Sequence, residues 1–450
     1  MEELKAGWRR VRLGDVIESI SDTTKIIEDE VVLINTSDVY DGKVLNHQLV
    51  ENKGLKGQFK KRFKYGDILY SEIRPINRRF AKIKFDSTNY LASTKLMILR
   101  KKENALIDEE YIYQLLKSDK IISELQQIAE SRSGTFPQIT FNELKTLEFF
   151  LPSLETQKKI TSILSSLDEK IELNRKINQN LEETAQTLFK RWFIDFEFPN
   201  EEGKPYKSSG GKMIKSELGE IPEGWKIKNL LEVGDFINGL AMQKYRPLDT
   251  EDSLKVIKIK EMNSGFSKES ELCSVNIPDT YKVNFGDILF SWSGTLKVMF
   301  WDKECGGLNQ HIFKVIPKNV NKLFLYFWLK IHLQTFIQIA QSKATTMGHI
   351  KRNDLNNSKI IVPNTEFWIY KEKILNSYLE KIVYQSKEIE KLIELRDYLL
   401  PRLMSGEIDI SNLKISEISN SDLSFYLIQF FHLIKIKLKQ FFLAILNHEF

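Results

Sequence analysis

Basic residues are concentrated in one short segment of the chain. Between Asn52 and Lys84, eleven Lys or Arg residues accompany only two acidic residues, Asp67 and Glu72, although the whole chain of 450 residues carries a net charge of just +5. Such a local density of positive charge favours binding of a polyanion. The alternative interpretation is a solvated surface face, and the charge run alone does not separate the two.

Residue patterns that would support catalysis are missing. The Gly211-Lys212 pair is followed by Met213 and lacks the earlier glycine of a phosphate-binding loop. The sequence has no GxGxxG after a strand, no HExxH, no zinc-spaced Cys/His set and no GxSxG. Its six histidines are scattered. We therefore predict a non-catalytic binding protein that carries no metal and no cofactor of its own.

The compartment is predicted from cysteine usage and from the apolar segments. Cys273 and Cys305 lie in one half of the chain, which favours a reducing cytoplasm over a disulfide framework. The N-terminus lacks the pattern of a secretory signal. Lys435, Lys437 and Lys439 interrupt the apolar stretch near the C-terminus. We expect a cytoplasmic protein with no membrane partner.

The chain repeats itself at a constant offset of 211 positions. Residues 135–191 realign without a gap on residues 346–402, pairing Pro152 with Pro363 and Ile171 with Ile382. Upstream the repeat continues with a drifting offset, as in Gly66-Asp67-Ile68-Leu69 and Gly286-Asp287-Ile288-Leu289. A period this long indicates a duplicated domain with a connector of fixed length.

Each repeat begins with a mixed segment that predicts an α+β domain. The expected strands are at 31–34, 95–99, 256–259 and 311–316, and the expected helices are at 111–129 and 322–341. We predict a first domain at 1–152, a first long helix at 153–197, a linker at 198–220, a second domain at 221–363, a second long helix at 364–406 and an apolar tail at 407–450. Glycine, proline and serine make 199–215 the flexible part of the linker.

Apolar residues recur at 4-3-4-3 spacing in both long helices, which is the pattern of a coiled coil. Either helix could instead pack on its own domain, but two copies of equal length favour antiparallel pairing. Asn174, Asn178 and Gln385 interrupt the pattern, either to control the register or because they turn toward solvent. The residues expected to pair the helices or to dock subunits are Leu164, Leu167, Ile171, Leu181, Leu188, Leu375, Ile382, Ile389, Leu392 and Leu399.

The junctions and helices resemble a known family. Ser133-Gly134-Thr135-Phe136-Pro137-Gln138-Ile139, the segments 151–160 and 167–182, and the helix end at 189–196 are similar to the signature of specificity subunits of type I restriction-modification enzymes. The resemblance covers residues 1 to about 410. It implies two target-recognition domains separated by two long antiparallel helices in a pseudo-twofold arrangement, with each domain reading half of a split DNA target.

The resemblance also implies partners and contact residues. The partners would be double-stranded DNA, two modification (methyltransferase) subunits and restriction (motor-nuclease) subunits, and S-adenosylmethionine, ATP and Mg would belong to those subunits. Arginine, Asn, Gln, Ser and Thr can reach base edges, whereas Lys and Arg contact phosphates. The candidate DNA-binding residues are Lys60, Lys61, Arg62, Arg74, Arg78, Arg79, Ser93, Thr94, Thr135, Gln138, Ser293, Thr295, Lys297, Asn309, Gln310 and Thr346.

Two questions stay open at the level of sequence. The competing function is a duplicated protein-binding scaffold without DNA specificity. Beyond residue 410 the tail has either the apolar spacing of an amphipathic helix that seeks a partner, or the composition of a read-through segment without a role.

Overall fold

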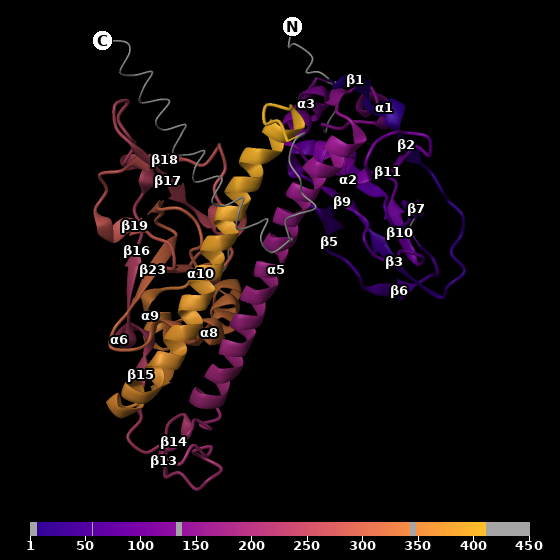
Figure 1. Ribbon diagram of the computed structural model, residues 1–450. Coiled ribbons are helices and arrows are strands. Elements are labelled where there is room, and N and C mark those ends of the chain that lie inside the picture. The colour runs from indigo at the N-terminus through magenta and orange to yellow at the C-terminus, as the bar shows by residue number, and fades with distance from the viewer. Residues whose placement is uncertain (1–6, 56, 132–136, 343–347, 411–450) are drawn as a thin grey trace. The chain divides into compact units, whose positions relative to one another are not determined.

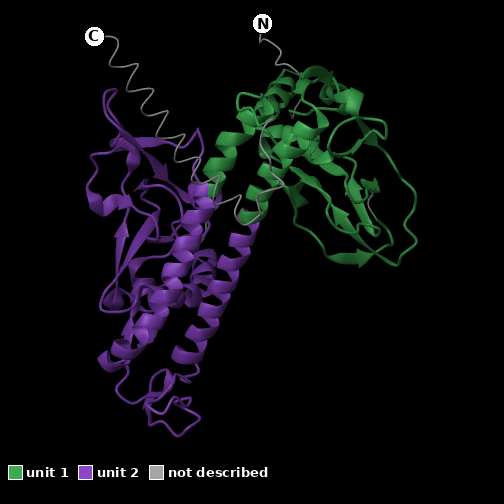
Figure 2. Cartoon of the chain, viewed as in Figure 1, with its two compact units in different colours: residues 1–170, 392–450 green, residues 171–391 purple. Residues whose placement is uncertain are grey.

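The computed structural model describes residues 7–55, 57–131, 137–342 and 348–410 (Figure 1). The chain forms two compact units, residues 1–170 with 392–450 and residues 171–391 (Figure 2). Two helices of 40 residues each, α5 (Leu154–Phe193) and α10 (Thr365–Met404), contribute residues to both units. Residues 411–450 of the predicted tail and the candidates Thr135 and Thr346 lie outside the described residues.

The described part of unit 1 contains two four-stranded sheets, a two-stranded ribbon and a second, shorter two-stranded pair. The ribbon pairs β1 (Arg9–Arg12) with β12 (Glu148–Leu151). The antiparallel sheet has the order β2 (Ile17–Ile20), β11 (Leu96–Lys101), β8 (Ile68–Ser71) and β9 (Phe80–Lys82). The second sheet has the order β6 (Leu49–Glu51), β3 (Glu30–Ile34), β10 (Tyr90–Ser93) and β7 (Phe59–Lys61), with β3 and β10 parallel. Shorter elements of the unit are α1 (Leu13–Val16), α4 (Phe141–Leu144) and the antiparallel pair of β4 (Val39–Tyr40) and β5 (Lys43–Val44).

Unit 2 repeats the β1–β12 ribbon and both four-stranded sheets strand for strand. Its ribbon pairs β15 (Lys226–Asn229) with β24 (Lys359–Val362). Its antiparallel sheet has the order β16 (Gly234–Asn238), β23 (Ile312–Pro317), β20 (Ile288–Ser291) and β21 (Lys297–Phe300). Its second sheet has the order β18 (Leu272–Ser274), β17 (Ser253–Ile257), β22 (Gly306–Leu308) and β19 (Lys282–Val283), with β17 and β22 parallel. The α+β class and the internal duplication are confirmed.

The helices in unit 1 differ in one respect from the prediction. The expected helix at 111–129 is two helices, α2 (Glu109–Leu116) and α3 (Asp119–Glu130). Ser118 has an extended backbone, and its hydroxyl donates to the Leu115 carbonyl at 2.7 Å. The Ser118 amide donates to the same carbonyl at 3.1 Å, so Ser118 closes the end of α2 and the chain can turn there. In unit 2 the prediction of one helix is confirmed by α8 (Lys322–Ser342).

The long helices run antiparallel in unit 2. Asn178 of α5 donates to the Ser386 hydroxyl of α10 at 2.8 Å, whereas the rings of Trp192 and Phe367 lie 6.0 Å apart. Numbers that rise along one helix therefore fall along the other. Of the ten residues predicted to pair the helices, seven are buried, and Leu181, Leu188 and Ile389 are half-buried.

Polar residues interrupt the helix pair near its middle. Asn174 is fully buried, so the alternative that it turns toward solvent is wrong. Neither its amide oxygen nor its amide nitrogen has a hydrogen-bond partner among the described residues, and the same holds for the side-chain oxygens of Asn178 and Gln385. Register control by these residues stays a prediction.

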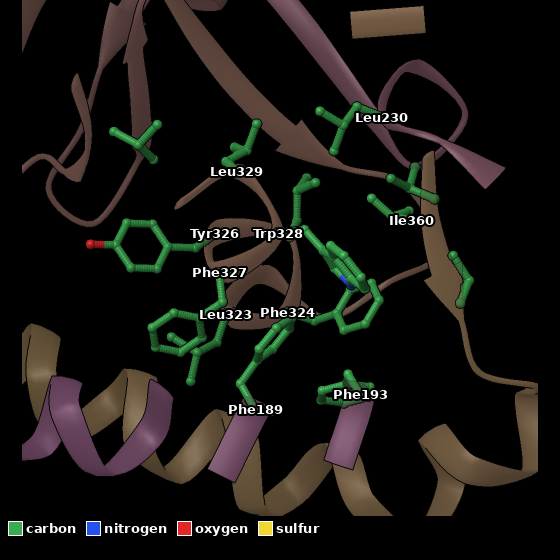
Figure 3. Close-up of a cluster of buried hydrophobic side chains, with 14 of the residues drawn as sticks. Phe189, Phe193, Leu230, Leu323, Phe324, Tyr326, Phe327, Trp328, Leu329 and Ile360 are labelled. Carbon is green, nitrogen blue, oxygen red and sulfur yellow. The ribbon is translucent and has the colours of Figure 1, made fainter. Parts of the chain in front are cut away.

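Aromatic side chains form the core of unit 2 (Figure 3). Phe189 and Phe193 of α5 pack against Phe324 of α8, with the Phe193 and Phe324 ring centroids 4.8 Å apart. By length and composition α8 is the one described helix that could cross a membrane. Its buried face packs against α5 and the antiparallel sheet, and so α8 is the core helix of this unit.

The segment expected to be a flexible linker is folded. Its residues form a turn in which the Phe198 and Tyr206 rings stack at 4.6 Å, followed by a hairpin of β13 (Met213–Ser216) and β14 (Gly219–Pro222). Phe198 also stacks on Trp225 at 5.1 Å. Burial of these rings in the core outweighs the flexibility that the glycine- and serine-rich composition suggested.

Candidate nucleic-acid interface

The two Gly-Asp turns directly precede β8 and β20. Gly66 and Gly286 have φ of 90° and 85°, a left-handed conformation that glycine adopts without strain. Asp67 is 1% exposed, accepts two hydrogen bonds from Arg100 at 2.7 and 2.8 Å, and accepts one from the Lys64 amide. In unit 2, Asp287 accepts from the Asn284 amide and pairs with Lys314. Because their acidic side chains are engaged inside the fold, the turns position the following loops.

Three of the segments that carry sequence-predicted contacts meet at one place in unit 1. The loop after β8 supplies Glu72, the residue before β11 is Lys95, and the residues before α4 supply Gln138. Backbone hydrogen bonds join them, from the Glu72 amide to the Lys95 carbonyl at 3.0 Å and from the Ile139 amide to the Glu72 carbonyl at 2.8 Å. The Lys95 ammonium lies 3.5 Å from a Glu72 carboxylate oxygen and 3.4 Å from the Gln138 amide oxygen. We name Glu72, Lys95 and Gln138 the first cluster.

The corresponding three segments meet in unit 2. The loop after β20 supplies Trp292, the residue before β23 is His311, and the residue 211 positions after Gln138 is His349. The Trp292 amide donates to the His311 carbonyl at 3.2 Å, and the Ile350 amide donates to the Trp292 carbonyl at 3.0 Å. The Trp292 ring lies 5.6 Å from the His311 ring and 6.4 Å from the His349 ring. We name Trp292, His311 and His349 the second cluster.

Neighbouring polar groups orient the second cluster. The Trp292 indole donates to the Asn238 side-chain oxygen at 2.8 Å. One nitrogen of the His311 ring is hydrogen-bonded to the Ser293 hydroxyl at 3.1 Å, and the other lies 3.3 Å from the Gln310 amide nitrogen. Two residues predicted from the sequence, Ser293 and Gln310, therefore hold a histidine that the prediction omitted.

Several residues predicted to contact DNA form hydrogen bonds to backbone carbonyls of their own domain. The Lys61 ammonium donates to the Thr94 and Leu96 carbonyls, both at 2.9 Å, and burial lowers the pKa of Lys61. The Lys297 ammonium donates to the Met262 carbonyl at 2.8 Å, and burial likewise lowers its pKa. These lysines connect strands and loops, and contact with a phosphate would require them to leave those carbonyls.

Arg78 is similarly engaged. Its guanidinium pairs with Asp41 at 3.1 Å and with Asp119 at 2.7 Å, and it also donates to the Lys117 carbonyl. Burial opposes its charge, but the two carboxylates raise its pKa. The neighbouring Arg79 donates to the Thr36 hydroxyl at 3.3 Å. Arg78 therefore fastens the loop after β8 to α3, a role that its position in a basic segment did not reveal.

The remaining candidates divide by exposure. Lys60, Arg74 and Thr295 are exposed, and Arg62, Thr94 and Gln310 are half-buried. Ser93 and Asn309 are buried, and their side-chain oxygens accept from the amides of Lys95 and His311, the cluster residues two positions further on. Ser93 and Asn309 thus set the backbone of the clusters.

The prediction missed five of the six cluster residues. His349 could have been found, because Gln138 was a candidate and the 211-residue offset leads from Gln138 to His349. Lys95 and His311 directly follow candidate pairs in the sequence. Glu72 and Trp292 lie in the loops that the resemblance gives as DNA-facing, residues 71–79 and 291–297, but acidic and indole side chains are not typical phosphate ligands and were not selected.

The chain is similar to proteins of one family over nearly its whole length. The model of the type I restriction modification DNA specificity domain matches residues 5–183 and 222–395. The specificity subunit of the type I restriction enzyme HindI from Haemophilus influenzae is 33% identical, with 89% of this chain and 99% of that protein covered. The MjaIX specificity subunit from Methanocaldococcus jannaschii is 31% identical, with 68% and 70% covered.

Among solved structures, the S subunit of a type I restriction-modification system from M. genitalium is 16% identical, with 90% of this chain and 97% of that chain covered and a TM-score of 0.48. The family model matches both repeats, and the HindI relative covers most of the chain. The protein therefore belongs to the family of type I restriction-modification DNA specificity subunits.

Proposed function

We propose that this chain is the DNA-recognition subunit of a type I restriction-modification complex, and that each domain reads one half of a bipartite target in duplex DNA. The observation that carries the proposal is the repeated convergence of three loop segments, once in each domain of a chain whose two repeats both match the family. A single binding surface would not require the same convergence twice.

Affinity and specificity come from different residues. The exposed Lys60 and Arg74 lie in the basic segment and supply phosphate contacts, which carry no sequence information. Base edges must be read by side chains that present a defined pattern of donors and acceptors. The two clusters offer such side chains at one place in each domain.

The chain acts with partners that supply the chemistry. Two modification subunits dock on the long helices and bring S-adenosylmethionine, and restriction subunits bring the ATP- and Mg-dependent motor and nuclease. The exposed side chains of Ile369, Tyr370 and Tyr384 on α10, each about 70% exposed, support docking there, because exposed aromatic and aliphatic groups are typical anchors of protein interfaces. The complex would act in the cytoplasm of a prokaryote.

The test is to map methylated adenines across the genome in cells that contain modification subunits with or without this chain. We expect methylation that depends on the chain and falls on two short half-sites separated by an unread gap. Retardation of DNA by the purified complex should weaken with salt, with a slope of about −0.9 per phosphate contact. A protein-binding scaffold without DNA specificity would instead give neither chain-dependent methylation nor salt-sensitive retardation.

A further inference from the structure

The two clusters share a backbone frame but not their side chains. We propose that the first cluster (Glu72, Lys95, Gln138) and the second cluster (Trp292, His311, His349) are the positions that set base specificity in the respective half-sites. This inference rests on the proposed function. It assigns specificity to six residues of stated chemistry, and it predicts that the two half-sites differ in sequence.

The frame is the same in both domains, bond for bond. The amide of the first cluster residue donates to the carbonyl of the second at 3.0 Å in unit 1 and at 3.2 Å in unit 2. The amide of the residue that follows the third cluster residue donates to the carbonyl of the first, from Ile139 to Glu72 at 2.8 Å and from Ile350 to Trp292 at 3.0 Å. A third hydrogen bond also recurs: the Arg74 amide donates to the Pro137 carbonyl at 3.0 Å, and the Gly294 amide donates to the Gly348 carbonyl at 3.2 Å. Isolated bridges link Ile73 with Gln138 and Ser293 with His349.

Backbone bonds of this kind hold the segments whatever side chains they carry. A substitution at a cluster position therefore changes the chemistry presented to a ligand with little effect on the fold, which is the condition for variable recognition on a constant scaffold. The side chains are also accessible, since that of Lys95 is 50% exposed and Gln138 is exposed, whereas Glu72 and the three residues of the second cluster are half-buried.

The first cluster offers hydrogen-bonding groups of three kinds. Glu72 can only accept, Lys95 can only donate, and the Gln138 amide can do both. A carboxylate suits the cytosine amino group, a lysine suits guanine, and a glutamine suits adenine. The contacts of Lys95 with Glu72 and Gln138, at 3.5 and 3.4 Å, are long for hydrogen bonds and can be exchanged for bases.

The second cluster offers ring faces and imidazole nitrogens in place of a lysine and a carboxylate. Ring faces contact the thymine methyl group or a base plane, and imidazole nitrogens donate or accept according to their protonation. Trp292 is held by Asn238, and His311 by Ser293. Because the two clusters differ at all three positions, the duplicated fold reads two different half-sites.

The experiment uses the full chain in complex with modification subunits and records the sequence of every methylated site. Glu72→Ala, Lys95→Ala and Gln138→Ala should each relax discrimination at one or two positions of one half-site, by about 5- to 150-fold for each lost bidentate contact. His311→Ala should relax the other half-site only. Glu72→Gln should change the preferred base, because an amide adds a donor.

Two control variants distinguish recognition of bases from support of the fold. Lys101→Ala removes the same charge from the other end of β11, and His332→Ala removes a histidine of α8 that is bonded to the Lys359 carbonyl. Neither should alter the methylated sequence. If the cluster variants lower methylation overall while the sequence of both half-sites is kept, the clusters are structural and the inference is overturned. If the unaltered complex shows no chain-dependent half-sites, the proposed function itself fails.

Discussion

The two domains attach to the long helices through different chemistry at equivalent positions. In unit 1, Asp168 of α5 pairs with Lys117 at 2.6 Å and with Arg396 of α10 at 3.2 Å. The offset of 211 places Leu379 where unit 1 has Asp168, and Ala185 where it has Arg396. The duplicated fold thus tolerates either an ion pair or apolar side chains at equivalent positions, provided that any charged groups placed there are paired.

A second pair of equivalent positions shows the same difference. Gln157 in unit 1 is 1% exposed, accepts from the Asp108 amide at 2.8 Å and donates to the Pro152 carbonyl at 2.9 Å. Its counterpart in unit 2 is Trp368, whose ring lies 5.2 Å from that of Phe324. Buried polar contacts are directional, whereas aromatic packing depends on area, so the two attachments should fail under different perturbations.

The largest effect is expected from the aromatic attachment. Phe193 is fully buried and its ring lies within 5.4 Å of those of Phe189, Phe324 and Phe367. Phe193→Ala should lower the free energy of unfolding of unit 2 by about 3 to 5 kcal/mol, because it leaves a cavity. Hydrogen exchange of α8 amides in a denaturant series would measure it. Ile194→Ala, at the partly exposed next position, is the matched control.

A smaller loss is expected from the ionic attachment. Asp168→Ala leaves Lys117, whose side chain is only 10% exposed, without its carboxylate, whereas Arg396, which is 20% exposed, keeps its pair with Asp397 at 2.7 Å. Because the Asp168 side chain is itself 28% exposed, we expect a loss of about 2 to 3 kcal/mol, below the range for fully buried pairs. Exchange of α2 and α3 amides would report it.

The double variant Asp168→Leu with Arg396→Ala sharpens the comparison. It places in unit 1 the residue types found at Leu379 and Ala185, and it removes the Arg396 cation, which would otherwise keep only Asp397 as its partner. It should therefore cost less than Asp168→Ala alone. A larger cost would show that the two sites differ in shape as well as in charge, and that the two solutions are not interchangeable.

The sequence predicted the duplicated architecture better than it predicted the hydrogen-bond and ion-pair partners of individual side chains. The constant offset and the heptad spacing were sufficient for the duplication and for both long helices, because periodic apolar burial is encoded locally. Arg78 shows where such reasoning fails. Its carboxylate partners, Asp41 and Asp119, lie 37 and 41 positions away, and only the tertiary fold brings them together. The clusters have the same origin, since each gathers three segments separated along the chain.

Replacing a polar residue in the middle of the helix pair should raise the free energy of unfolding, whereas the variants above lower it. Asn174 and Gln385 occupy equivalent positions of the repeats, and the buried amide of Asn174 has no described partner. Asn174→Leu should raise the free energy of unfolding by about 1 kcal/mol, because it removes the penalty of a buried unpaired amide. Thermal unfolding of the complex would show it, with Asn180→Leu, at an exposed position of the same helix, as the control. A loss of stability would reveal that Asn174 is satisfied in solution.

The smallest expected effect separates the two attachments by pH. Burial lowers the pKa of His332, which lies 6.1 Å from Trp328 by ring centroids, despite its bond to the Lys359 carbonyl. The unfolded chain takes up the proton near the ordinary pKa of about 6.5, so the folded state of unit 2 loses stability as pH falls through that value.

Burial alone would raise the pKa of Asp168, but Lys117 and Arg396 lower it, so its contribution to unit 1 persists until pH falls below the ordinary pKa of 3.8. Between pH 7.5 and 5.5, exchange should therefore show a loss in unit 2 that His332→Gln reduces, while the contribution of Asp168 to unit 1 is unchanged. An equal loss in unit 2 with and without His332 would contradict this assignment, since the other histidines are common to both proteins.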